Sequence, residues 1–420
     1  MNMLARPRIR RMGAFDIAPQ HGWEPRAMAE NSKSARSEKM ARAVSIAALR
    51  DLAARRLPHA LFDFIDGGAT DEITMRHNET DFGKWMLVPR YAADVSRRNL
   101  STDMLGRMAD MPLMLSPTGL AGMFWPHGEL HAVRATAKAN IPLCLSTNSV
   151  CSMEEVAKAA PDADRWFQLY FLKDREWMRT LVQRAQNSGY RVLCVTIDLP
   201  VHGRRERDER NAFTIPLRPR LANIINVMTK PGWLMGAVRC PPRFGNFEVP
   251  GAMGMKSIAR RDGNLFDPTI TWDDVARIRD MWKGPFMVKG VLHPEDAVKA
   301  IGAGCDAIMI SNHGGRQLDR VPSPIDALSD IVDAVKGKAQ LIVDGGVRRG
   351  SDIFIARAFG ATACSIGRPY LWGLCAGGED GVARALDIFR DELDNTMSLM
   401  GVSNIADVNA SHLRRRDPRH

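Results

Sequence analysis

The seven cysteines of this 420-residue chain lack any pattern that would give them a shared task. No CxxC pair and no cluster of cysteines and histidines at zinc spacing occurs, so we expect no metal site. An odd, scattered set is also a poor disulfide framework and is typical of reduced thiols in the cytoplasm. The cysteines stand at positions 144, 151, 194, 240, 305, 364 and 375.

Long apolar runs are missing as well. No stretch reaches 18 apolar residues, so no transmembrane helix is expected. The N-terminus has no apolar core of a signal peptide, and its acidic residues weaken an interpretation as a transit peptide. Met40 could be the start of the folded protein. These absences predict a cytoplasmic protein.

The net charge of +10 suggests nucleic-acid binding until it is located along the chain. Residues 1–40 contribute +4 and residues 413–420 contribute +3, which leaves only +3 for the body. Basic ends of this kind are typical of solvated, disordered tails. We therefore expect a folded domain over 41–412 between two basic tails, and no nucleic-acid partner.

Short apolar strands alternate with helical periodicity from residue 112 onward, which is the pattern of parallel βα units. Eight such units predict a (β/α)₈ TIM barrel, with residues 41–110 as an N-terminal cap and Gly381–Gly401 as a terminal helix. The predicted strands are Pro112–Ser116, Ile141–Ser146, Trp166–Tyr170, Val192–Asp198, Phe286–Lys289, Asp306–Asn312, Gln340–Asp344 and Ala363–Gly367.

A long excursion, 208–268, interrupts this rhythm between the fourth and fifth strands. Its middle, 221–239, is apolar with interspersed basic residues. Long loops in compact domains are usually functional or mobile, so it could be an active-site lid or a surface that touches a membrane. An ordinary excursion that packs on the barrel without such a role is an equally favoured alternative.

Polar residues follow all eight predicted strands, where TIM barrels hold their active sites. After the last two strands, glycines stand beside arginines in Asp344–Gly350 and Ile366–Pro369, a pattern suited to phosphate. Gly302-x-Gly304 precedes a strand and so is not a dinucleotide fingerprint. A mononucleotide such as FMN is therefore favoured over NAD.

At these residues the sequence resembles the FMN-dependent α-hydroxy-acid oxidising family, which includes glycolate oxidase, lactate oxidase, flavin L-lactate dehydrogenase and mandelate dehydrogenase. The most specific motif is Ser311-Asn-His-Gly-Gly-Arg-Gln-Leu-Asp319, supported by Trp166–Tyr170, Val288–Gly290 and Asp344–Gly350. Pro117–Gly119 and Asp198–Arg207 look closest to the mandelate dehydrogenase branch. The resemblance implies FMN as cofactor and a small L-2-hydroxy acid as substrate.

The resemblance also implies a role for each site residue. His313 would be the catalytic base, oriented by Asp198. Arg316 and Arg205 would bind the substrate carboxylate, with Arg204 as the less favoured alternative to Arg205. Tyr170 would bind the reacting oxygen, and Lys289 would lie beside the flavin N1/C2 carbonyl. The implied flavin contacts are Pro117, Thr118, Gly119, Ser146, Gln168, Thr196, Lys289 and Ser311; those of the phosphate end are Asp344, Gly345, Gly346, Arg348, Gly367 and Arg368.

Two positions depart from the family pattern. Phe64 stands where most relatives carry a tyrosine that helps to bind the carboxylate, so the substrate could be bound more weakly or be larger and more apolar. Gly119 stands where oxidases of the family commonly carry alanine, which favours a dehydrogenase. Whether electrons leave as a hydride or after a carbanion is left open.

The leading hypothesis is a dehydrogenase for lactate or mandelate that passes electrons to a quinone or another carrier. An oxidase that makes hydrogen peroxide is a close alternative, and a flavin-binding barrel without this chemistry is a remote one. The resemblance further implies a homotetramer and a peripheral contact of residues 221–239 with the inner face of the membrane.

Overall fold

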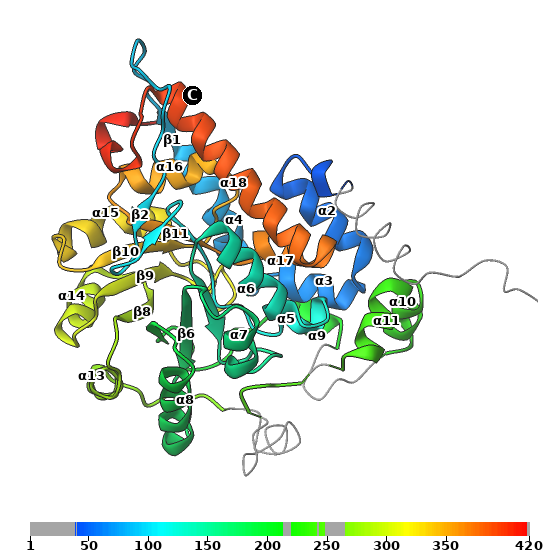
Figure 1. Ribbon diagram of the computed structural model, residues 1–420. Coiled ribbons are helices and arrows are strands. Elements are labelled where there is room, and N and C mark those ends of the chain that lie inside the picture. The colour runs from blue at the N-terminus through cyan, green and yellow to red at the C-terminus, as the bar shows by residue number, and fades with distance from the viewer. Residues whose placement is uncertain (1–37, 39, 213–219, 242, 248–264, 418–420) are drawn as a thin grey trace, which may run out of the picture.

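The computed structural model describes residues 38, 40–212, 220–241, 243–247 and 265–417. Eight parallel strands form a closed barrel in the order β10-β11-β4-β5-β6-β7-β8-β9, which confirms the predicted TIM barrel (Figure 1). All residues of these eight barrel strands except Gly290 and Gln340 are buried, because side chains fill the barrel interior and helices cover its outside. The strands are β4 (Leu113–Leu115), β5 (Leu143–Ser146), β6 (Arg165–Tyr170), β7 (Val192–Thr196), β8 (Phe286–Val291), β9 (Ala307–Ser311), β10 (Gln340–Asp344) and β11 (Ala363–Ile366).

Helices alternate with these strands, and local sequence starts several of them. Ser152 and Glu155 form a reciprocal capping box at the start of α7, and Ser323 caps α15, which has Pro324 in its first turn. The helices of the barrel are α5 (Ala121–Phe124), α6 (Gly128–Ala139), α7 (Met153–Ala159), α8 (Arg175–Asn187), α13 (Trp272–Met281), α14 (Pro294–Gly302), α15 (Pro324–Val335) and α16 (Gly350–Ala358).

The N-terminal cap consists of α2 (Ile46–Arg56), α3 (His59–Asp66), α4 (Ile73–Thr80) and the 3₁₀ turn η1 (Asp81–Lys84). The strand that follows, β1 (Trp85–Leu87), pairs antiparallel with β12 (Leu413–Arg415). This pairing corrects the predicted boundary at residue 412, because the first three residues of the expected basic tail belong to the folded body. Residues 1–37 and 39 of the expected N-terminal extension lie outside the described residues.

Three smaller elements complete this end of the chain. A short hairpin joins β2 (Thr102–Asp103) to β3 (Met108–Ala109), and two 3₁₀ turns, η2 (Ile405–Asp407) and η3 (Ala410–His412), precede β12.

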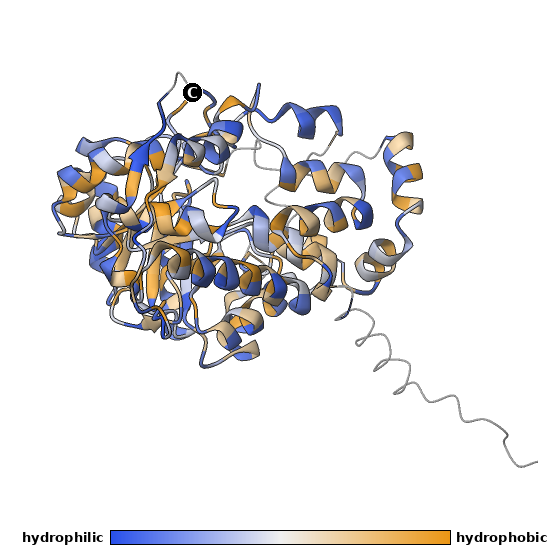
Figure 2. Ribbon diagram, turned by 90° about the horizontal axis from the view of Figure 1, so that it is seen from above, coloured by the Kyte–Doolittle hydropathy of each residue, from blue (hydrophilic) through white to orange (hydrophobic). Residues whose placement is uncertain are grey.

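The excursion between β7 and β8 carries α9 (Glu206–Arg210), α10 (Leu221–Met228) and α11 (Pro231–Arg239). Figures 1 and 2 show α10 and α11 as a pair at the periphery of the molecule, beside the N-terminal cap. Among the described helices, none is both long enough and apolar enough to cross a membrane.

Two further helices follow the last barrel strand: α17 (Arg368–Gly377) and the predicted terminal helix α18 (Glu379–Met400). Because α17 starts two residues after β11, it holds Arg368 at the carboxyl end of the barrel. The two helices approach closely at a pair of glycines. A Cβ added at Gly373 would lie 2.3 Å from the carbonyl oxygen of Gly381.

This contact makes Gly373→Ala a test of how α17 is held. Alanine favours a helix by about 1 kcal/mol over glycine, but the overlap with α18 is expected to give a net loss of about 1–3 kcal/mol in the free energy of unfolding. The matched control is Gly232→Ala in α11, where an added Cβ meets open space. Urea unfolding of both variants measures the difference, and equal stabilities would contradict the close approach.

Candidate active site

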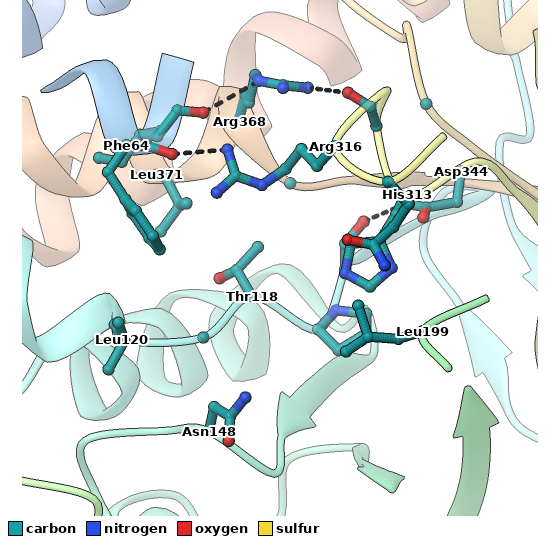
Figure 3. A pocket seen from close by; sticks show the side chains of 18 of the residues that line it. Phe64, Thr118, Leu120, Asn148, Leu199, His313, Arg316, Asp344, Arg368 and Leu371 are labelled. Carbon is teal, nitrogen blue, oxygen red and sulfur yellow. Dashed lines mark hydrogen bonds between the residues drawn. The ribbon is translucent and has the colours of Figure 1, made fainter. Parts of the chain in front are cut away.

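A cavity of about 460 Å³ lies at the carboxyl ends of the barrel strands. Most of the residues singled out from the sequence line it, and they come from all parts of the chain (Figure 3). They are Phe64, Pro117, Thr118, Gly119, Tyr170, Arg205, Lys289, His313, Arg316, Asp344, Gly345, Gly346, Arg348, Gly367 and Arg368.

The other predicted residues lie beneath or behind the lining. Ser146, Gln168 and Thr196 are buried at the ends of adjacent strands, where Gln168 accepts from Ser146 (3.3 Å) and donates to Thr196 (2.9 Å). Ser311 is buried beside Lys289, and Asp198 stands behind His313. These side chains lie beneath the lining residues, and two of them contact Lys289 and His313 directly.

His313 lies between a carboxylate and the cavity. Its Nδ1 is 2.9 Å from Oδ1 of Asp198, and its Nε2 is 3.4 Å from the hydroxyl of Tyr170. Burial raises the pKa of Tyr170, so the phenol stays protonated. Since Asp198 occupies Nδ1, the other ring nitrogen is the one that can take a proton from a bound molecule.

The backbone at His313 is left-handed, with φ of +58°, and Gly314 and Gly315 continue this turn. Such a conformation costs about 1–3 kcal/mol for a residue with a side chain and must be held by its surroundings. The preceding Asn312 holds it by two reciprocal side-chain bonds to Asn78 of α4, of 2.6 and 2.9 Å. Sequence reasoning missed Asn78, because nothing near residue 78 links it to the motif around residue 312.

Two further residues of the motif, Gln317 and Asp319, hold neighbouring segments in place. Gln317 donates to the carbonyls of Asp198 and Val201, which ties the loop after β7 to the loop after β9. Asp319 accepts from the backbone N–H of Thr74 (2.7 Å). Burial alone would raise the pKa of this carboxyl, but N–H groups at the start of α4 outweigh it and lower the pKa to about 2.

Lys289 is buried between two carboxylates. Its Nζ is 3.1 Å from Asp344 and 3.9 Å from Asp198, and it donates to Ser311 (2.7 Å). Burial opposes the charge of Lys289, but the two carboxylates outweigh burial and raise its pKa. Burial would likewise raise the pKa of Asp198, yet the charges of His313 and Lys289 lower it. Burial would also raise the pKa of Asp344, but Lys289 and the hydroxyls of Ser116 and Ser311 lower it, so Lys289, Asp198 and Asp344 are all charged at neutral pH.

Gly290 makes room for this cluster. It has a φ of +99° and lies in β8 where the register with β9 shifts. A Cβ there would lie 2.6 Å from Cβ of Asp198, so any side chain would displace the carboxylate that orients His313.

Two arginines flank the cavity over the ring of Phe64. The guanidinium of Arg316 lies 4.9 Å and that of Arg205 5.4 Å from the ring centroid. Arg316 donates through Nη1 to the carbonyl of Phe64 (2.6 Å), a bond drawn in Figure 3. Arg205 lines the cavity and pairs with Asp208 (3.2 Å), whereas Arg204 is exposed and pairs with Glu209.

The charge of Arg316 is poorly balanced. Burial, together with the positive charges of Arg205 and Arg368, lowers its pKa well below the usual value. A bound carboxylate would offset this repulsion, since guanidinium groups pair with planar anions. This end of the cavity is therefore suited to a small carboxylic acid.

The neighbouring part of the cavity, at the loops after β10 and β11, is suited to a phosphate. Arg368 donates to the carbonyls of Ile65, Gly314 and Gly67, and burial with the charge of Arg348 lowers its pKa to about 10. Arg348 has a buried Nε without a partner among the described residues. Gly345 and Gly367 leave the backbone partly accessible there, whereas Gly346 is buried against the backbone of Asn78. This unpaired donor and the bare backbone fit the phosphate of FMN.

Several lining residues were not predicted from the sequence. The excursion contributes Phe244, Phe247, Leu265 and Phe266, which give the cavity an apolar wall and which no sequence motif marks. Asn148, Leu199, His202 and Asp208 also line the cavity. Within the described ranges, no three His, Cys, Asp or Glu side chains gather as a metal site.

Comparison with known proteins shows the family to which the chain belongs. Residues 53–415 match the family model for FMN-dependent dehydrogenases, and the chain belongs to this family. It is an FMN-dependent enzyme.

Two curated relatives illustrate the range of the family. The chain is 43% identical to an L-lactate dehydrogenase of Caulobacter vibrioides over 374 residues, which cover 88% of this chain and 97% of the relative. It is 40% identical to an L-lactate oxidase of a Nostoc species, with 86% and 95% of the two chains covered.

Among solved structures, the monotopic membrane protein (S)-mandelate dehydrogenase superposes with a TM-score of 0.85 at 38% identity, covering 89% of this chain and 99% of the other. A mandelate oxidase superposes with a TM-score of 0.74 at 34% identity and covers the same shares. Dehydrogenases and oxidases thus share this fold.

Loss of catalysis and loss of bound flavin are expected in two different variants. His313→Ala removes the proton acceptor and leaves the phosphate end intact, so the protein should be yellow but lose at least 1,000-fold in kcat. Arg368→Ala should lose bound flavin on gel filtration. Absorbance of the purified variants and flavin reduction by a panel of 2-hydroxy acids measure both, and full activity of His313→Ala would overturn the assignment.

Proposed function

We propose that the protein oxidises an L-2-hydroxy acid of the lactate or mandelate type to the 2-oxo acid and passes the electrons to a quinone or another carrier. The observation that carries this proposal is His313, which has Asp198 on one ring nitrogen and the cavity on the other. Two arginines for a carboxylate lie across the same cavity.

In this proposal, His313 takes a proton from the substrate at Nε2. Asp198 orients the ring and stabilises the imidazolium that forms. Tyr170, whose hydroxyl lies 3.4 Å from that nitrogen, donates to the reacting oxygen of the substrate. Oxidation to the 2-oxo acid removes two electrons and two protons in all: His313 would accept one proton, and the electron pair with the second proton would go to the flavin when it is bound.

Arg316 and Arg205 bind the carboxylate of the substrate and so orient the reacting carbon. Phe64 supports them through its ring and its carbonyl rather than through a hydroxyl. Arg205 exchanges its present partner, Asp208, for the substrate. The cation–π contacts keep both guanidinium groups over the ring during this exchange.

The residues that would hold FMN are those of the phosphate end together with Pro117, Thr118 and Gly119. When bound, FMN supplies the two-electron acceptor of the reaction. Lys289 places a fixed positive charge in the cavity wall, where it would balance negative charge that gathers on reduction. Ser146, Gln168, Thr196 and Ser311 support this wall from beneath.

Transfer to a carrier rather than to oxygen is supported by Gly119. Oxidases of the family commonly carry alanine at this position. Here a Cβ would lie 3.3 Å from Cβ of Asn148 and would narrow the cavity. The family relatives include both dehydrogenases and oxidases, so an oxidase that forms hydrogen peroxide is the alternative.

The acceptor can be tested under one set of turnover conditions. The holoenzyme is expected to reduce a quinone analogue or dye with far less than one hydrogen peroxide formed per substrate oxidised in air. Both products are measured in parallel, with a heat-treated sample as the control. Stoichiometric peroxide would establish the oxidase. A yellow protein that no 2-hydroxy acid reduces anaerobically would instead point to the non-catalytic barrel.

We also propose that the α10–α11 pair contacts a membrane surface at the inner face. Its outward residues include Leu221 (73% exposed), Ile225 (59%) and Val238 (74%), and no acidic residue occurs between Arg220 and Cys240. Exposed apolar side chains beside basic ones are typical of helices that lie in an anionic lipid interface. The mandelate dehydrogenase neighbour is a monotopic membrane protein.

The α10–α11 pair is fixed to the body on its inner side. Trp233 donates to the carbonyl of Met123 (2.9 Å), and Asn226 accepts from the backbone N–H of His59 (2.7 Å). The apolar residues are therefore left on the outer side of a rigidly attached element. The homotetramer implied by the family resemblance stays a prediction.

Sedimentation with vesicles that contain anionic lipid tests the contact. Wild type should co-sediment and the double variant Ile225→Glu/Val238→Glu should not, because two charges would enter the interface. The matched control, Val44→Glu/Leu399→Glu, changes two equally exposed residues elsewhere and should sediment like wild type. Equal sedimentation of all three would contradict the contact.

A further inference from the structure

The apolar wall of the cavity is held rigidly at two places, and the first is Phe266. Residues 265–267 run antiparallel to the chain that leaves β6. Lys173 donates to the carbonyl of Leu265 (3.0 Å), and Asp267 donates to that of Phe171 (3.0 Å). Phe266 is therefore fixed beside Tyr170, with ring centroids 5.1 Å apart in an edge-to-face contact.

The second place is the turn that carries Phe244 and Phe247. Asn246 is fully buried between these two residues, and its amide donates to the carbonyl of Thr147 (3.2 Å) and to the hydroxyl of Ser149 (2.9 Å). Both rings line the cavity as a result. The aromatic wall, defined as Phe244, Phe247 and Phe266, is thus anchored to the ends of β5 and β6.

His202 adds one polar group to this wall. Its ring makes an edge-to-face contact with Phe266 at 4.9 Å, and it lines the same cavity while its side chain remains accessible. Its ring nitrogens have no hydrogen bond to any described residue. Burial and the positive charge of Arg205 lower its pKa, so the imidazole is neutral at neutral pH and offers one donor and one acceptor.

These groups are connected by successive contacts within the cavity. The hydroxyl of Tyr170 lies 3.4 Å from His313, Phe266 contacts Tyr170, and His202 contacts Phe266. A substrate whose carboxylate lies on Arg316 and Arg205 would therefore extend its side chain along aromatic rings toward an imidazole. A methyl side chain would end before this wall, whereas a flat ring would pack against it.

We propose that the substrate is an L-2-hydroxy acid whose side chain is an aromatic ring with a hydroxyl at its far edge, and that His202 binds this hydroxyl. The inference rests on the proposed function and specifies its substrate class. His202 is a specificity-determining residue that touches only the side chain of the substrate.

Binding without turnover tests His202 directly. The holoenzyme is titrated with phenylacetate and with 4-hydroxyphenylacetate, and the change in flavin absorbance gives each Kd. Wild type should bind the hydroxylated acid about five- to tenfold more tightly, a modest gain because accessible His202 must first release water. His202→Leu should bring the ratio of the two Kd values to about one, His202→Gln should keep part of it, and the surface control His59→Leu should retain it.

The same variants are then compared in kcat/KM for L-mandelate, 4-hydroxy-L-mandelate and L-lactate. Loss of the hydroxyl preference in His202→Leu alone would support the proposal. A ratio near one in wild type, or an unchanged ratio in His202→Leu, would overturn it. Turnover of lactate but not of either aromatic acid would overturn this inference and leave the proposed function standing. Reduction by none of the acids would sink the proposed function, while the binding titration would still decide the role of His202.

Discussion

The site depends on one buried ammonium group. Lys289 is shared by Asp344 and Asp198, which lie 3.1 and 3.9 Å from it on the loops or ends of two other strands. Removal of one member of such a buried group typically costs about 3–5 kcal/mol, so the three strand ends are held together by charge. The cluster still carries one excess negative charge, because one cation faces two carboxylates. Asp198 faces Nδ1 of His313 at 2.9 Å and would therefore stabilise the imidazolium that forms when Nε2 takes a proton.

A second group of charges has the opposite sign and lies across the cavity. Arg316, Arg205 and Arg368 repel one another, and Asp208 only partly balances them. An incoming hydroxy acid would therefore be oriented by its charge, with its carboxylate on the arginines and its hydroxyl toward His313. The two anions would still differ in their partners: the carboxylate would lie on Arg316 and Arg205, and the phosphate would lie on Arg368 and Arg348 beside the glycines of the last two loops.

The barrel and the residues at its strand ends were predictable, because parallel topology brings every strand end to the same rim whatever the distance in sequence. His313, Lys289 and Asp344 needed no further information. Asn78 and Phe266 could not be found in this way, since each reaches the site through a contact between segments that no local pattern encodes. The strand Leu413–Arg415 could not be predicted because of its charge. Arginines in an edge strand resemble a solvated tail unless the partner strand, Trp85–Leu87, is known.

Phe64 shows how a departure from a family pattern changes meaning once its surroundings are known. From the sequence, it is the loss of a hydroxyl that would bind the carboxylate. In the structure, its ring lies under two guanidinium groups at 4.9 and 5.4 Å, contacts worth about 0.5–2 kcal/mol each, and its carbonyl binds Arg316. The position therefore still serves the carboxylate, but through the arginines. The substitution at this position therefore bears on which acid is bound, because it acts through the two guanidinium groups that face the cavity.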